Sequence, residues 1–153
     1  MSIIWKYLDK RSAAVDALKD YSSMEFIIAH TDDEIKAAYE KMSGVSSPQL
    51  DGMPRSRNPQ GAEERIIKGI EEIDVLRERY RQAMEYMAWF LPAWNALTED
   101  ERYVLETFYG EDNQYGASAI YDICDRFGIE RSSAYNRKNR ALSHLVVLLF
   151  GKA

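Results

Sequence analysis

A run of cationic, amide and hydroxyl side chains follows a glycine in the carboxyl-terminal part of the sequence. The stretch GIERSSAYNRKNRAL covers residues 128 to 142. Guanidinium and amide groups can form paired hydrogen bonds with the edges of bases, and hydroxyl, phenol and ammonium groups can bind phosphates. The candidate residues for contact with DNA are Arg131, Ser132, Ser133, Tyr135, Asn136, Arg137, Lys138, Asn139 and Arg140.

The balance of charge changes sign in this part of the chain. The 153 residues carry a formal net charge of −5 at pH 7. Residues 117 to 153 nevertheless contain six Lys or Arg side chains against three Asp or Glu side chains. A negative overall charge argues against a protein that coats nucleic acid with its whole surface, but it allows one basic surface. We therefore expect an anionic partner to bind the carboxyl-terminal part.

The pattern around the basic stretch predicts two helices joined by a tight turn. The helices should cover residues 117–127 and 131–150, with Gly128 supplying a positive φ in the turn and Ile129 filling the corner between them. A glycine turn, an inward apolar face and an outward polar face are the requirements of a helix–turn–helix that reads DNA. The residues expected to face inward are Ile120, Ile123, Cys124, Phe127, Ala134, Ala141, Leu142 and Leu145.

The rest of the chain is also predicted to be helical, which makes the fold class all-α. Ala, Leu, Glu, Lys, Arg and Met dominate windows of helical period, and no sustained alternation predicts a strand. One helix is expected over residues 4–21. A second is expected over residues 32–42, because Thr31 and Glu34 have the spacing of a capping box.

The longest predicted helix starts at Ala62 and carries an apolar seam with heptad spacing, interrupted only by Arg77. Pro92 is expected to kink or end it, and a capping box of Thr98 and Glu101 should begin the next helix, which ends by Gly110. The seam predicts either an antiparallel helical hairpin within the chain or a coiled coil between copies. The seam residues are Ile66, Ile70, Ile73, Tyr80, Met84, Met87 and Leu91.

These elements predict two domains. Residues 1–94 form a helical amino-terminal module with a long loop at 44–61, where prolines and glycines preclude a regular element. Residues 97–153 form the helix–turn–helix domain. Residues 145–150, LVVLLF, are apolar on every side of their helix and must be covered by the amino-terminal helices or by another subunit. A homodimer is thus expected through the amino-terminal helices or this apolar tail.

The carboxyl-terminal sequence resembles region 4 of bacterial sigma factors, the helix–turn–helix that reads promoters. The likeness lies in IYDICDRFGIERSSAYNRKNRALSHL and in the preceding LTEDERYVLETFY. The wider chain is similar to small phage and prophage transcriptional regulators of the ArpU and RinA type. The resemblance implies that Arg131 reads bases or the adjacent backbone, that Asn136 reads bases and that Arg140 contacts the backbone. Arg137 stands where that family has an inward isoleucine, so we expect its stem to be buried and its guanidinium to lie at the rim.

These observations predict a sequence-specific DNA-binding transcription regulator. The resemblance implies an activator of phage or prophage genes that acts with host RNA polymerase on double-stranded DNA. The alternative is a protein-interaction module that binds RNA polymerase or a sigma factor without direct contact with DNA.

Other classes of function have little support in the sequence. No nucleophile motif, phosphate-binding glycine loop or metal-spaced His and Cys set is present, so we expect no enzyme activity, no cofactor and no metal. No signal peptide is recognisable, and no apolar run approaches the ~20 residues that cross a bilayer. A cytoplasmic protein without a membrane partner is expected.

Overall fold

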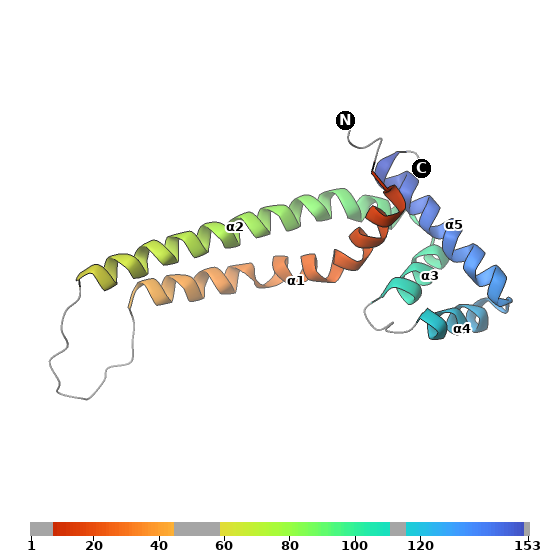
Figure 1. Cartoon of the computed structure of the whole chain (residues 1–153), viewed down its shortest axis with the longest axis horizontal. Helices are drawn as coiled ribbons and strands as arrows, with labels where there is room; N and C mark the ends of the chain where they lie inside the picture. Colours follow the sequence, from red (N-terminus) through yellow and green to blue (C-terminus); the bar gives the residue numbers. More distant parts are fainter. Residues whose placement is uncertain (1–7, 45–58, 111–115, 152–153) are drawn as a thin grey trace. The chain divides into compact units, whose positions relative to one another are not determined.

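The computed structural model describes residues 8–44, 59–110 and 116–151 (Figure 1). Every regular element within these ranges is an α-helix, so the predicted all-α class is confirmed. None of these helices is long and apolar enough to cross a membrane. The predicted loop at 44–61 lies mostly outside the described residues, but its residues 59–61 are helical, so the prediction is wrong for these three. The helices are α1 Lys10–Met42, α2 Pro59–Ala96, α3 Glu99–Tyr109, α4 Gly116–Phe127 and α5 Arg131–Phe150.

Helix α1 is continuous where the sequence predicts two helices. The side chain of Thr31 is buried, and its hydroxyl donates a hydrogen bond to the carbonyl oxygen of Ile27, one turn earlier. A threonine can occupy a helix interior in this way, because the hydroxyl is satisfied by the carbonyl four residues before it. The predicted capping box of Thr31 and Glu34 is therefore wrong.

Helix α2 continues through Pro92 and ends at Ala96. Proline removes one N–H donor from a helix. The flanking Phe90 and Ala93 are buried in a core, and we infer that this packing holds the helix together across the proline. The predicted capping box of α3 is confirmed, since Thr98 and Glu101 exchange hydrogen bonds of 3.2 and 3.1 Å between side chain and backbone.

The described chain forms two compact units, and both α1 and α2 contribute to each of them. Unit 1 contains Met1–Ser23 and Tyr86–Ala153, and unit 2 contains Met24–Glu85. The domain boundary expected from sequence, between residues 94 and 97, rests on the local signals of a proline and a helix cap. The division in space follows long-range packing instead.

The core of unit 1 is built from segments that lie far apart in the sequence. Phe90 is only 1% exposed, and the rings of Tyr21, Tyr86 and Trp94 surround it at centroid distances of 5.8, 5.3 and 5.9 Å. At the apolar end of α5, Leu145, Val146, Leu149 and Phe150 are buried in this core. Val147 and Leu148 remain 42% and 36% exposed, so the predicted covering of this segment is only partial. The buried residues that meet here are Ala14, Ala17, Phe90, Ala93, Leu97, Leu105, Ala141, Leu142, Leu145, Val146, Leu149 and Phe150.

A second apolar cluster in unit 1 fixes α3, α4 and α5 against one another. Val104, Ile120, Ile123 and Ala134 are buried in it. Partly buried side chains complete its edges, namely Tyr103, Phe108, Cys124, Phe127 and Ile129.

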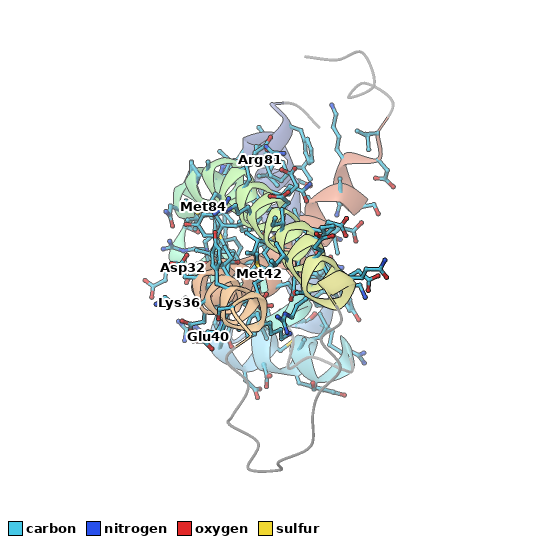
Figure 2. All side chains as sticks on the ribbon, turned by 90° about the vertical axis from the view of Figure 1, so that its left-hand side faces the viewer. Asp32, Lys36, Glu40, Met42, Arg81 and Met84 are labelled. Carbon is cyan, nitrogen blue, oxygen red and sulfur yellow. The ribbon has the colours of Figure 1, made fainter. Side chains whose placement is uncertain are left out.

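In unit 2 the α1 and α2 segments lie side by side and run antiparallel. Met42 packs against Gly69, where a Cβ atom would lie 2.1 Å from Met42 Cγ, and Figure 2 shows Met42 between the two ribbons. Nη2 of Arg77 donates a hydrogen bond of 3.4 Å to the hydroxyl of Tyr39. The buried residues of unit 2 are Thr31, Ala38, Gly69, Ile73, Leu76 and Ala83.

The predicted seam of α2 faces α1 only in part. Ile73 is buried against α1, as expected, whereas four other members of the seam lie exposed beside it. Gly69 contacts the side chain of Met42 on α1, and Ala83 is buried. The exposed members of the seam are Ile66, Ile70, Tyr80 and Met84.

Candidate nucleic-acid interface

A three-residue turn positions the basic helix α5. Gly128 has a φ of 63°, in the left-handed region that side-chain-bearing residues rarely adopt. The N–H of Ile129 donates a hydrogen bond of 3.2 Å to the carbonyl oxygen of Cys124, and the Ile129 side chain packs into the second cluster. The predicted positive φ and the predicted corner residue are both confirmed.

The inward face of α5 determines which of its side chains face outward. Ala134, Ala141, Leu142 and Leu145 are buried, as predicted. Of the nine candidate residues, Arg137 and Lys138 are half-buried. The exposed candidates are Arg131, Ser132, Ser133, Tyr135, Asn136, Asn139 and Arg140.

Arg137 lies at the edge of the outward face rather than within it. Its guanidinium carbon is 4.2 Å from the centre of the Phe127 ring, at the end of α4. A guanidinium over an aromatic face is held by cation–π attraction and loses part of its freedom of rotation. The side chain of Arg137 is half-buried, which agrees with the expectation from sequence that its aliphatic stem is buried.

Lys138 is turned toward α3. Its Nζ lies 4.3 Å from the centre of the Phe108 ring and 5.5 Å from that of the Tyr135 ring. Burial, and secondly the nearby charge of Arg11, lowers the pKa of Lys138. The ammonium group therefore belongs to the flank of α5 and is less available to a ligand than the exposed side chains.

Arg11 of α1 joins this flank and is a residue that sequence reasoning missed. Its Nη2 donates a hydrogen bond of 3.2 Å to Oδ1 of Asn139, and its Nη1 donates one of 3.0 Å to Oγ of Ser143. Arg11 is exposed, so it adds a cation to the polar surface of α5. It lies 128 positions from Asn139, and no spacing within the sequence pointed to it.

Six of the seven exposed candidates fall into two groups. Arg131, Ser132, Ser133 and Asn136 occupy the first turns of α5, where Arg131 also approaches the ring of Tyr121 at 5.7 Å. Tyr135 and Asn139 lie on the flank that Lys138 and Arg11 share. The first group contains the side chains that the resemblance assigns to base reading.

A shallow groove of about 370 Å³ separates the middle of α5 from the start of α3. Arg137 and Arg140 line it from α5, and Asp100 and Glu101 line it from α3. Opposite charges on its two sides make this groove less favourable for a phosphate than the first turns of α5. Arg140 itself remains exposed at the rim.

His144 of α5 contacts Glu101 of α3, with a distance of 2.7 Å between Nδ1 and Oε2. Burial acts to raise the pKa of Glu101, but hydrogen bonds from His144 and from Thr98 outweigh it, so the pKa lies below its ordinary value of 4.5. The carboxylate form of Glu101 is thus part of the folded structure.

Within the described ranges, no group of three or more His, Cys, Asp or Glu side chains is placed to hold a metal ion. The chain matches no protein-family model, no curated protein and no solved structure. The residues and geometry of α5 and its neighbours are therefore the basis for assigning a function.

Proposed function

We propose that this chain is a sequence-specific DNA-binding transcription regulator. In this proposal α4, the turn at Gly128 and α5 form a helix–turn–helix, and α5 enters the major groove of double-stranded DNA. The sequence of this module resembles region 4 of sigma factors, and on that ground the proposal has the protein act with host RNA polymerase as an activator of phage or prophage genes.

One observation supports the proposal above the others. Seven neighbouring candidate side chains on α5 are exposed, while the opposite face of the same helix is buried in two apolar clusters. The exposed set combines arginine and asparagine, which pair with base edges, with serine and tyrosine, which bind phosphates. A rigidly held helix with this surface meets the requirements for direct reading of base pairs.

Selection of bound sequences from random DNA with the purified protein tests the proposal. Substitution of Asn136 or Arg131 by Ala should then weaken binding to the selected site by ~1 to 3 kcal/mol and relax the preference at one position. Arg79→Ala is the matched control, because it removes an exposed cation from α2 in unit 2. It should leave the affinity for DNA unchanged.

Failure to enrich any sequence would contradict the proposal. The protein-interaction alternative predicts that outcome together with direct binding to RNA polymerase or to a sigma factor, which a pull-down with purified polymerase measures. A uniform loss of affinity for every DNA sequence in the Asn136→Ala variant would assign Asn136 to the backbone rather than to a base.

A further inference from the structure

Helix α2 presents a stripe of large apolar side chains that stay exposed beside the described residues of unit 2. Ile66, Ile70, Tyr80 and Met84 are 43%, 49%, 37% and 44% exposed. With Arg77, also exposed, they form what we name the outer stripe. Figure 2 shows Met84 on one side of α2, and Asp32 and Lys36 on the same side of α1.

Two heptad series overlap on α2. The inner series, Gly69, Ile73, Leu76 and Ala83, is buried, and Gly69 contacts Met42 of α1. The residues of the outer stripe stand at positions 66, 70, 77, 80 and 84. Position 73 would continue this heptad series between 70 and 77, and it is occupied by Ile73 of the inner series. A helix with two adjacent seams has the pattern of a helix that packs against two neighbours. Helix α1 supplies one neighbour, and the described residues of unit 2, 24–44 and 59–85, contain no helix for the other.

The buried residues described in unit 2 are mostly small. Thr31, Ala38, Gly69 and Ala83 are among them, and Ile73 and Leu76 are its two large aliphatic residues. The larger apolar surface lies in the outer stripe. An apolar stripe of this kind on an antiparallel helix pair is typically buried by a further helix pair, as in a four-helix bundle.

We infer that the outer stripe is a homodimer interface in which two copies of α2 pack antiparallel. Symmetry supports a second copy as the occupant, because an antiparallel pair with its two-fold axis near residue 75 matches the stripe with itself. Ile66 then lies level with Met84 of the partner subunit, and Ile70 lies level with Tyr80 of the partner subunit. Such pairs form the layers of an antiparallel coiled coil. Both copies use the same surface, as an interface with two-fold symmetry requires.

Charge selects this orientation over the parallel one. A parallel pair would place Arg77 opposite Arg77 in the middle of the apolar stripe, where like charges destabilise the contact. In the antiparallel register Arg77 lies within one residue of the level of Asp74 of the partner subunit. Unit 2 contains thirteen acidic and nine basic residues, so its charge does not favour nucleic acid as the occupant.

Measurement of the molecular mass of the full chain in solution, across a dilution series and without DNA, tests the interface. The unsubstituted protein should be a dimer at micromolar concentration. Ile70→Glu should raise the dissociation constant by about 100-fold or more, because it places a charge in the centre of the contact. Val75→Glu is the matched control: Val75 is 58% exposed on the opposite side of α2, and its substitution should leave the dimer intact.

Cysteine cross-linking tests the register. In a Cys124→Ala background, Ile70→Cys combined with Tyr80→Cys should form a disulfide-linked dimer under mild oxidation. Ile70→Cys alone should form no disulfide. In the antiparallel register the two copies of residue 70 are separated along the helix axis by ten residues, which is about 15 Å at 1.5 Å per residue.

The outcomes separate this inference from the proposal of DNA binding. A monomeric unsubstituted protein, or a dimer that Ile70→Glu leaves intact while helicity is retained, would overturn the interface. Efficient cross-linking of Ile70→Cys alone would overturn the antiparallel register. Because the mass is measured without DNA, a dimer that binds no DNA supports the interface and contradicts only the proposed function.

Discussion

Nδ1 of His144 lies 2.7 Å from Oε2 of Glu101 and joins α5 to the capping box at the start of α3. The other carboxylate oxygen of Glu101 accepts a hydrogen bond of 3.1 Å from the backbone N–H of Thr98. One carboxylate therefore serves both the helix cap and the contact between two helices. Its protonation should loosen both.

Stability should fall at acidic pH through Glu101. Its pKa in the folded protein is below 4.5, so its contribution to the free energy of unfolding is complete above that pH and is lost as the pH falls below it. Urea unfolding at a series of pH values measures this loss. In Glu101→Gln the free energy of unfolding should change less between pH 6 and pH 3, whereas Glu99→Gln, in the same helical turn, should follow the unsubstituted protein. Parallel curves for all three proteins would contradict the assignment.

Substitution of Gly128 should destabilise the turn before α5. A Cβ atom at this position would meet nothing within 4 Å, so the cost comes from the φ of 63° alone. We expect Gly128→Ala to lower the free energy of unfolding by about 1 to 2 kcal/mol, and Gly128→Asn to lower it by less, because asparagine tolerates the left-handed region. Equal losses for both variants would show that crowding, rather than backbone conformation, makes glycine necessary here.

Phe90 should be among the most costly residues to truncate. It is buried among three aromatic rings contributed by α1 and α2. Phe90→Ala should lower the free energy of unfolding by about 3 to 5 kcal/mol. Phe26→Ala is the control, since Phe26 is 57% exposed, and it should cost under about 1 kcal/mol. Chemical denaturation of both variants distinguishes these values.

Arg11 should contribute to DNA binding if α5 is the recognition helix. Arg11→Ala removes a cation and releases Asn139, so the affinity for DNA should fall. The slope of log affinity against log salt concentration should decrease by about the amount expected for one phosphate contact. The loss should be non-additive with that of Asn139→Ala in a double-mutant cycle, because the two side chains share a hydrogen bond. Lys19→Ala, an exposed cation elsewhere on α1, should leave affinity unchanged. Strict additivity would mean that Arg11 does not position Asn139.

Local signals in the sequence predicted α3 to α5 well. The capping box of Thr98, the glycine at 128 and the apolar spacing that follows each act within a few residues, and the helices begin and end close to where these signals place them. The buried and exposed faces of α5 follow from the same spacing. Seven of its nine candidate side chains are exposed for this reason.

Other features were not predictable in this way, either because one motif fits two local structures or because the partners lie far apart in the sequence. The hydroxyl of Thr31 is satisfied inside α1, and a sequence motif does not distinguish that hydrogen bond from a helix cap. Two apolar series with heptad spacing run along α2, and their spacing alone does not tell which of them is buried and which is exposed. Arg11 meets Asn139 only after α1 packs beside α5.

The packing of Ala14 and Ala17 with the end of α5 has a consequence for how the protein folds during synthesis. Arg11 and its partner Ser143 are separated by 132 positions, so the ribosome releases the start of α1 long before α5 exists. Unit 2 lies entirely between them in the chain and can pair its two helical segments first. The apolar turns of α1 then remain open to chaperones until α5 emerges, and the rate of maturation should depend on that late closure.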